Sequence, residues 1–265
     1  MNDVMPKRFY NILIGLLFGF LLAACQSQEI KRENSTIGTH TKSPADVYVS
    51  LGVEYMKLGI NDVALEKLRK AVQVDPNSSD AQNVLGVLYE QLGEKVLAEM
   101  HYEKAVYIKP SNSSAQNNYA RFLCQSGEYS QADKHFRLAI QNPLYKSAIK
   151  AVTNAGVCAL ADNNIEKAEA YFRSALLHNK RYSPALFQMA NLRAKQNNYL
   201  SVRAYLQRFR SVQKHTAASL WLGIQAEREL ENQDAVASYS LELRQFFPDS
   251  YEASLLEKSE LTSPQ

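Results

Sequence analysis

Apolar and small residues recur along this chain at a spacing of about 34 residues, which predicts a row of similar helix pairs. Gly52 and Ala64 return 34 residues later as Gly86 and Ala98, and four further copies follow. Within each copy the apolar residues stand at i, i+3, i+4 and i+7, the periodicity of an amphipathic helix. One small residue of the first helix marks the six copies: Gly52, Gly86, Ala120, Gly156, Ala190 and Gly223.

The first copy shows how each pair is expected to form. A helix is predicted over residues 46–58, ended by Gly59, and a second helix begins with Asn61 as its cap. Glycine inside a helix costs about 1 kcal/mol relative to alanine. Gly52 therefore predicts a close approach of the partner helix where Ala64 packs. The expected core residues of this copy are Leu51, Tyr55, Ala64 and Leu68.

Period, spacing and residue types together resemble the tetratricopeptide repeat. The resemblance implies an all-α fold, a right-handed superhelical solenoid of six repeats with a long concave surface for partners. A capping helix over about 249–260 is expected to cover the open end through Tyr251, Leu255 and Leu256. Extra residues near 142–146 predict a wider turn. The expected repeats are 45–78, 79–112, 113–148, 149–182, 183–215 and 216–249.

The first 24 residues have the layout of a signal peptide. Two basic residues precede an apolar run over 9–24, which is shorter than the roughly 20 residues of a membrane-spanning helix. The run ends in Leu22-Ala23-Ala24-Cys25, which resembles the bacterial lipobox and implies a lipid on Cys25. Gln26 stands where an aspartate would resemble the inner-membrane retention signal, so the outer membrane is expected. The polar stretch 26–44 predicts a flexible tether.

Composition and motifs disfavour several other functions. The net charge is +3 and no run of Lys and Arg exceeds two residues, so nucleic acid is not expected as a partner. No phosphate loop, nucleophile elbow, HExxH or CxxC occurs. We therefore expect no enzyme activity, cofactor or small-molecule substrate. His101 and His135 take equivalent places in neighbouring copies, but no further ligand accompanies them, and we assign them to a solvated helix face rather than a metal site.

Cys124 and Cys158 lie on the first helices of neighbouring copies, which are expected to pack side by side. Two interpretations stay open. The pair could form a disulfide in an oxidising compartment, although helix axes 8–10 Å apart are marginal for the Cα separation that the bond needs. Alternatively, both are small buried apolar residues.

The concave face of the first three repeats is the candidate partner site, because its first part is unusually apolar. Val and Met side chains next to amides suit an extended or helical peptide. An alternative is that Val53 and Met56 pack within the array. The candidate groove residues are Val49, Val53, Met56, Lys57, Asn83, Val87, Asn117 and Arg121. A second apolar patch is expected at Val157, Leu160, Phe187, Leu220 and Ile224.

The lipobox, the tether, the six repeats and one local segment together resemble the type IV pilus biogenesis and stability lipoproteins, the PilW/PilF family. The segment 117–124, Asn-Asn-Tyr-Ala-Arg-Phe-Leu-Cys, is close to that family's Asn-Asn-Tyr-Gly-x-Phe-Leu-Cys, with Ala120 in place of glycine. The resemblance implies a pilotin that brings the pilus secretin to the outer membrane and assists its assembly into a ring. The family's cysteine spacing also resembles Cys124 and Cys158, which implies a disulfide between them.

Two alternative functions are compatible with the same repeat fold but involve a different partner. One is a lipoprotein scaffold for cell-wall hydrolases or an outer-membrane assembly machine. The other is a cytosolic co-chaperone that clamps acidic C-terminal tails, which requires basic residues at matched groove positions. Lys57 and Arg121 alone are too few for such a clamp.

Overall fold

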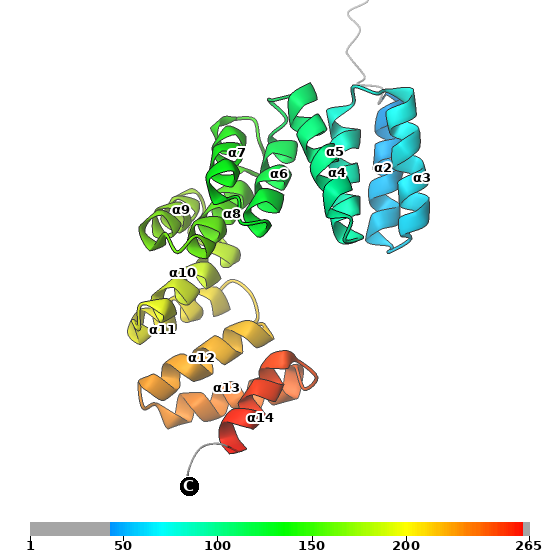
Figure 1. Ribbon diagram of the computed structural model, residues 1–265. Coiled ribbons are helices and arrows are strands. Elements are labelled where there is room, and N and C mark those ends of the chain that lie inside the picture. Colours follow the sequence, from blue (N-terminus) through cyan, green and yellow to red (C-terminus); the bar gives the residue numbers. More distant parts are fainter. Residues whose placement is uncertain (1–42, 262–265) are drawn as a thin grey trace, which may run out of the picture. The chain divides into compact units, whose positions relative to one another are not determined.

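The computed structural model describes residues 43–261, where every regular element is an α-helix (Figure 1). The interpretations placed on residues 1–24, on Cys25 and on most of the tether lie outside this part. None of the thirteen described helices is long and apolar enough to cross a membrane. Their bounds are α2 Pro44–Lys57, α3 Asn61–Val74, α4 Ser79–Gln91, α5 Lys95–Ile108, α6 Ser113–Gln125, α7 Tyr129–Gln141, α8 Ala148–Ala161, α9 Ile165–His178, α10 Ser183–Lys195, α11 Tyr199–Arg210, α12 Ala217–Glu229, α13 Gln233–Phe246 and α14 Tyr251–Leu261.

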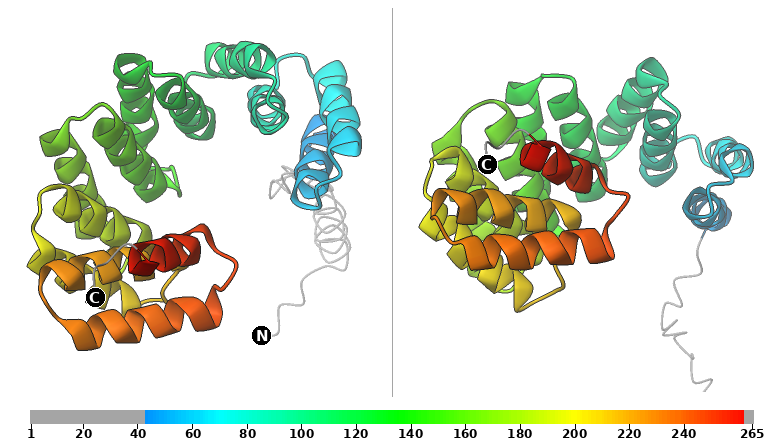
Figure 2. Two further views of the ribbon diagram at one scale, coloured as in Figure 1. Left: turned by 60° about the horizontal axis from the view of Figure 1, so that its bottom comes forward. Right: turned by 90° about the horizontal axis from the view of Figure 1, so that it is seen from below.

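Consecutive helices form six antiparallel pairs, because a turn of only three residues joins the two helices of each pair. The pairs stack in chain order within one compact unit (Figures 1 and 2). Each first helix also contacts the first helix of the next pair, whereas the described second helices do not contact one another. The first helices therefore form the inner layer. The predicted all-α array of six helix pairs with a capping helix is confirmed.

The first helix begins earlier than predicted because Ser43 caps it. Ser43 Oγ accepts a hydrogen bond from the Asp46 N–H, and the Ser43 N–H donates to the Asp46 carboxylate. Pro44 fits the first turn, where its missing N–H is not needed. Asn61, in contrast, is not the cap of α3. The cap is Ile60, which makes no side-chain cap bond, and Asn61 already lies inside the first turn.

The glycines of the first helices face large side chains. A Cβ added to Gly52 would lie 2.6 Å from Leu68 Cγ but 3.4 Å from the Ala64 carbonyl oxygen. A Cβ added to Gly86 would lie 2.7 Å from the Tyr102 ring. The predicted close approach is therefore present at the Ala64 backbone, but the side chain that faces Gly52 is that of Leu68, not that of Ala64. The large residue of the second helix fills the space that the missing Cβ leaves.

The core lies between neighbouring helix pairs, so the first pair is buried by a neighbouring pair on one side only. Ala64 and Leu68 are fully buried as predicted, and Tyr55 packs against the same cluster. Leu51 is 40% exposed, whereas Leu85, its equivalent in the second pair, is 2% exposed. Leu51 was expected in the core. It is exposed because no described helix precedes α2.

The longer connection and the cap lie where the sequence predicted them. Six residues, 142–147, join α7 to α8, whereas four, 109–112, join α5 to α6, so the turn is wider. Helix α14 packs on α12 and α13 and buries Leu256 completely, with Leu255 half-buried. Tyr251 was expected in this contact but is 71% exposed, because it lies on the opposite side of the helix from Ala253 and Leu256.

Candidate partner-binding groove

The concave groove is built from two positions of each first helix, three residues before and one residue after the small residue of that helix. These positions are four residues apart and therefore share one face, while the small residue packs on the partner helix. In the first three repeats they are Val49 and Val53, Asn83 and Val87, and Asn117 and Arg121. The groove thus changes from apolar on α2 to polar on α6.

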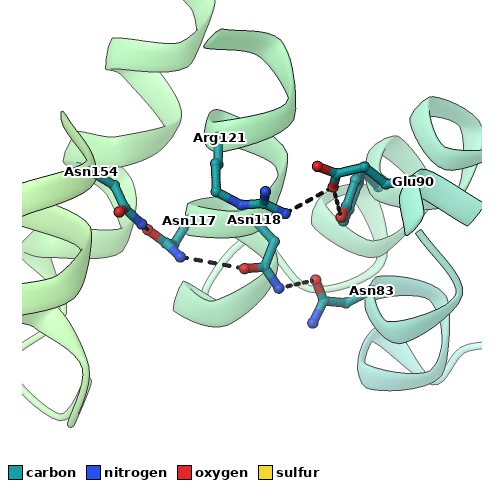
Figure 3. Close-up of polar contacts among 7 residues, drawn as sticks. Asn83, Glu90, Asn117, Asn118, Arg121 and Asn154 are labelled. Atoms are coloured by element: carbon teal, nitrogen blue, oxygen red, sulfur yellow. Dashed lines mark hydrogen bonds and ion pairs between the residues drawn. The ribbon is translucent and has the colours of Figure 1, made fainter. Parts of the chain in front are cut away.

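Four asparagines form a hydrogen-bonded row across α4, α6 and α8 (Figure 3). Asn118 Nδ2 donates to Asn83 Oδ1 at 3.0 Å, and Asn154 Nδ2 donates to Asn117 Oδ1 at 3.1 Å. Within α6, Asn117 Nδ2 donates to Asn118 Oδ1 at 3.4 Å. Asn83 and Asn117 are only 6% and 3% exposed. The two amides predicted to grip a partner are thus largely covered, and the half-buried Asn118 and Asn154 are the more accessible members.

A charged network stands beside the asparagine row. Arg121 forms an ion pair with Glu90 at 2.8 Å (Figure 3). Tyr102 donates its hydroxyl hydrogen to the same carboxylate at 2.7 Å. With its amide oriented to suit both neighbours, Gln125 donates to Glu90 and accepts from Arg121. Burial raises the pKa of Tyr102, and its hydrogen bond to Glu90 raises it further. Arg121 is therefore held in place within the protein, which differs from a free clamp for a carboxylate.

The apolar end of the groove consists of Val49, Val53 and Met56, all half-buried. Met56 packs against the main core cluster, as does Val87. The alternative that Met56 packs within the array is thus partly realised. Val49 and Val53 do not belong to that cluster among the described residues, which leaves them to line the groove. Lys57, at the edge, pairs with Glu54 at 2.7 Å.

The second apolar patch is not continuous, contrary to expectation. Val157 is 41% exposed and Phe187 is half-buried, but Leu220 and Ile224 are fully buried. These last two form a cluster with Leu243, Ala253 and Leu256, of which Ala253 and Leu256 belong to α14. The capping helix occupies the groove positions of α12, so repeat six offers no open apolar surface there. Leu160 packs against the cluster around Phe172.

Cys124 on α6 and Cys158 on α8 are joined in the structure as a disulfide. Their Cα atoms are 5.8 Å apart, inside the range that a disulfide spans. The pair links the first helices of the two repeats that the wider turn connects. Cys158 is 3% exposed, so solvent reaches the pair mainly from the side of Cys124.

His101 and His135 each pair with a glutamine of their own repeat. Both were expected on a solvated helix face, but both are half-buried. The Nδ1 atoms lie 2.6 Å from the side-chain oxygens of Gln82 and Gln116. Both rings are half-buried, and that of His101 stacks on Tyr89 with an interplanar angle of 7°. Among the described residues no group of three potential metal ligands occurs.

Sequence reasoning missed the partners that complete the polar groove. Asn118 and Asn154 each donate to the asparagine of the preceding repeat, and Tyr102 reaches the groove from a second helix. The adjacent pair Asn117-Asn118 was a usable signal, because one member stands at the groove position and the other reaches back. Tyr102 gave no such signal, since its spacing marks it only as core.

Comparison with known proteins supports the fold and gives the family. A tetratricopeptide repeat model matches residues 49–113. The type IV pilus assembly protein PilF of Pseudomonas aeruginosa is 33% identical over 207 residues, which cover 78% of this chain and 82% of that protein. The solved structure of P. aeruginosa PilF shares 32% identity over 81% of this chain and 97% of that one, with a TM-score of 0.71.

A second solved structure is similar over the same extent. It is PilW, described as a widely conserved type IV pilus biogenesis factor. It is 25% identical, covers 81% of this chain and 99% of its own, and gives a TM-score of 0.75. Both likenesses span nearly the whole described array, including the helices that carry the groove. This chain therefore belongs to the family of tetratricopeptide-repeat proteins of type IV pili that includes PilF and PilW.

Proposed function

We propose that this chain is a non-enzymatic, outer-membrane-anchored lipoprotein of type IV pilus biogenesis. It binds the pilus secretin subunit and promotes the localisation of the secretin to the outer membrane and its assembly into a ring. Membership of the PilF and PilW family supports the link to pilus biogenesis. The lipobox at Cys25 supports the anchor, which holds the array at the periplasmic face of that membrane.

One structural contrast carries the choice of binding site. In repeat six, the groove residues Leu220 and Ile224 hold Leu256 of the amphipathic helix α14. The equivalent residues of repeat one, Val49 and Val53, have no described helix over them. A helix of the chain itself thus packs on these positions in repeat six, which supports the same use of them in repeat one. The same apolar positions at repeat one fit an apolar side chain of a partner's helix or extended segment.

The rest of the groove is polar, and its hydrogen-bonding groups would limit how a partner segment is oriented. Asn118 on α6 and Asn154 on α8 present half-buried amides further along the groove, and such amides can bond the backbone of an extended segment. Burying the apolar end contributes about 25 cal/mol per Å² of apolar surface. Ordering the partner reduces that gain. Specificity therefore depends on the apolar contact and the polar row acting together.

The test places charge in the apolar end and spares the core. Val49→Glu with Val53→Glu buries two carboxylates against any apolar partner, so secretin binding should fall at least tenfold. Met56 is left intact because it packs on the core. The matched control is Val74→Glu with Val96→Glu, two exposed valines of α3 and α5. Thermal melts followed by circular dichroism establish that both variants fold, and secretin capture and ring assembly are then measured.

The outcomes separate the candidate partners. Loss of secretin capture in the groove variant alone supports the proposal. Normal capture and ring assembly by a folded groove variant would remove this groove as the secretin site. Cross-linking from Val53 would then show whether a cell-wall hydrolase or a component of an outer-membrane assembly machine occupies it instead.

A further inference from the structure

The turns at the two edges of the helical array carry opposite charge. Because the helices of each pair are antiparallel, turns within pairs lie at one edge and turns between pairs lie at the other. Hydrogen bonds tie neighbouring between-pair turns together. Asn142 Nδ2 donates to Ser113 Oγ at 2.9 Å, and the Arg181 guanidinium donates to the Ser211 carbonyl at 3.2 Å.

The charges sort by edge without exception in the middle of the array. The within-pair turns have no Lys or Arg, and their charged residues are Glu94, Glu128, Asp162 and Glu231. The four middle between-pair turns, 109–112, 142–147, 179–182 and 211–216, have no Asp or Glu. Their charged residues, here called the basic edge, are Lys109, Lys146, Lys180, Arg181 and Lys214. The outermost between-pair turns carry Asp75 and Asp249 and lie outside it.

The lysines of the basic edge are exposed, and none has an ion-pair partner among the described residues. The arginines inside nearby helices behave differently. Arg193 pairs with Glu169 at 2.6 Å, and Arg210 pairs with Glu242 at 2.9 Å. Carboxylates thus pair these two arginines but none of the lysines of the basic edge; the Asp80 carboxylate, which lies near one turn of that edge, accepts a hydrogen bond from Asn112 at 2.8 Å. An uncompensated row of this kind attracts an extended anionic surface.

Large apolar side chains project beside three of these lysines. Tyr107 and Leu144 are each 85% exposed, and Leu177 is 80% exposed. Each precedes a lysine of the basic edge by two or three residues. Cations next to protruding Leu and Tyr are the combination that binds bilayer interfaces, where the charge meets headgroups and the apolar tip enters the acyl boundary. An acidic protein would require the charges but not the projecting apolar residues.

We propose that the basic edge docks the array on the anionic phospholipid headgroups of a bilayer. The chain enters the array at this same edge, since α2 begins there at Pro44. The identity of the membrane rests on the proposed function, in which the lipid is on Cys25, 18 residues before Ser43. The tether expected from the polar composition, taken as a random coil, averages about 25 Å end to end, which would keep the edge within reach of the surface.

The experiment uses the unacylated segment from residue 42 onward, which is a compact unit with its own core. Vesicles of phosphatidylglycerol and phosphatidylcholine are compared with vesicles of phosphatidylcholine alone by co-sedimentation. The edge variant is Lys109→Gln, Lys146→Gln, Lys180→Gln and Lys214→Gln. The control variant makes the same change in charge at exposed lysines away from the edge: Lys95→Gln, Lys104→Gln, Lys134→Gln and Lys195→Gln.

Binding to the anionic vesicles is expected, and it should weaken in 0.5 M salt because exposed charges are screened. About 1 kcal/mol per basic residue converts to roughly fivefold, so the edge variant should bind at least a hundredfold more weakly. The control variant should bind nearly as the wild type does. Leu144→Ser with Leu177→Ser should also weaken binding, with no change in charge.

Three results would overturn the proposal. They are absence of binding to anionic vesicles, equal losses in the edge and control variants, and binding to polyglutamate with the same lysine dependence but not to vesicles. The last result assigns the edge to an acidic protein. None of these measurements involves acylation or a secretin, so their failure leaves the proposed function standing. Failure of Cys25 acylation in turn leaves the vesicle result unchanged.

Discussion

At the scale of single residues, the groove and the core depend on what faces each position. The glycines of the first helices lower helix stability, but a ring or a branched side chain occupies the space where their Cβ would lie, so a larger residue would not fit there. The packing of Tyr102 against Gly86 has a second consequence. It brings the Tyr102 hydroxyl to Glu90, so a core residue also fixes the charged network of the groove.

Gly156→Ala is expected to destabilise the protein. Alanine gains about 1 kcal/mol of helix propensity, but its Cβ would lie 2.7 Å from Phe172 Cδ1 and closer still to Cε1. Overpacking of this kind costs typically about 1–3 kcal/mol, so the overlap outweighs the gain. Gly223→Ala is the matched control, since the nearest Tyr239 carbon would be 3.0 Å away. Urea denaturation measures both. A Gly156→Ala protein more stable than the wild type would contradict the packing argument.

Three histidines should make the fold sensitive to mild acid. Burial is the main cause that lowers the pKa of His101, His135 and His215, and nearby Lys104 and Lys134 lower the first two further. The folded state therefore binds fewer protons than the unfolded state, whose histidines titrate near about 6.5. Stability is present above that pH and falls as the pH drops below it.

The measurement is the free energy of unfolding at pH 7.5 and at pH 5.5, a window above the range where carboxylates titrate. The wild type should lose stability at the lower pH. His101→Gln with His135→Gln should lose less, because two of the three groups no longer titrate. His178→Gln is the control, since His178 is exposed. An equal loss in all three proteins would assign the acid sensitivity to other groups.

At the scale of elements, the disulfide joins the first helices of the two repeats that the widest connection links. Cys124 on α6 and Cys158 on α8 close a loop that contains α7 and the 142–147 turn. The chain-entropy model gives roughly 3–4 kcal/mol for a loop of this length. The bond therefore stabilises the middle of the array, where two extra residues would otherwise loosen the packing between repeats.

Cys124→Ala with Cys158→Ala is expected to lower the free energy of unfolding by about 2–4 kcal/mol. Reduced wild-type protein should be destabilised to a similar degree. In the oxidised native protein, mass spectrometry should find one peptide pair joined through these residues. Alkylation of both thiols in protein prepared without reductant would show that the bond does not form.

At the scale of the whole molecule, the sequence predicted the helices well. It predicted poorly which helix faces are buried by a neighbouring helix and which are exposed. The recurring pattern, with intervals of 33 to 36 residues between equivalent positions, places every helix pair, because each repeat must bury the same face against its neighbour. It does not show which faces a non-repeated element covers. Leu220 and Ile224 follow the groove pattern yet lie under α14, and Leu51 follows the core pattern yet is exposed at the free end. Both errors concern the ends of the array, where a repeat has another repeat on one side only.

The polar part of the groove was predicted only in outline, because the repeat pattern does not show bonds between non-equivalent positions. Asn83 and Asn117 stand at the right positions, but their burial comes from Asn118 and Asn154, which are offset by one residue from the repeat. A pattern that compares equivalent positions does not detect a bond between unequal ones. The groove is therefore better described as a row of bonded amides beside an apolar end than as eight independent contacts.

The proposed lipid anchor concerns the whole chain, because it would decide where the array works. Cys25→Ser should abolish incorporation of labelled palmitate and release the protein from the outer-membrane fraction, since the thiol is the acyl acceptor of the lipobox. Firm anchoring requires more than one acyl chain, so loss of acylation should leave at most weak, salt-sensitive membrane association.

The groove variant Val49→Glu with Val53→Glu is the control for this anchor prediction. It should retain full palmitate labelling and outer-membrane fractionation while losing secretin capture. The Cys25→Ser protein should show the reverse pattern, with secretin capture in solution but no rings at the outer membrane. If Cys25→Ser is labelled as strongly as the wild type, the anchor lies elsewhere in the chain. If both variants lose capture equally, binding requires the membrane, and the groove and the anchor act as one site.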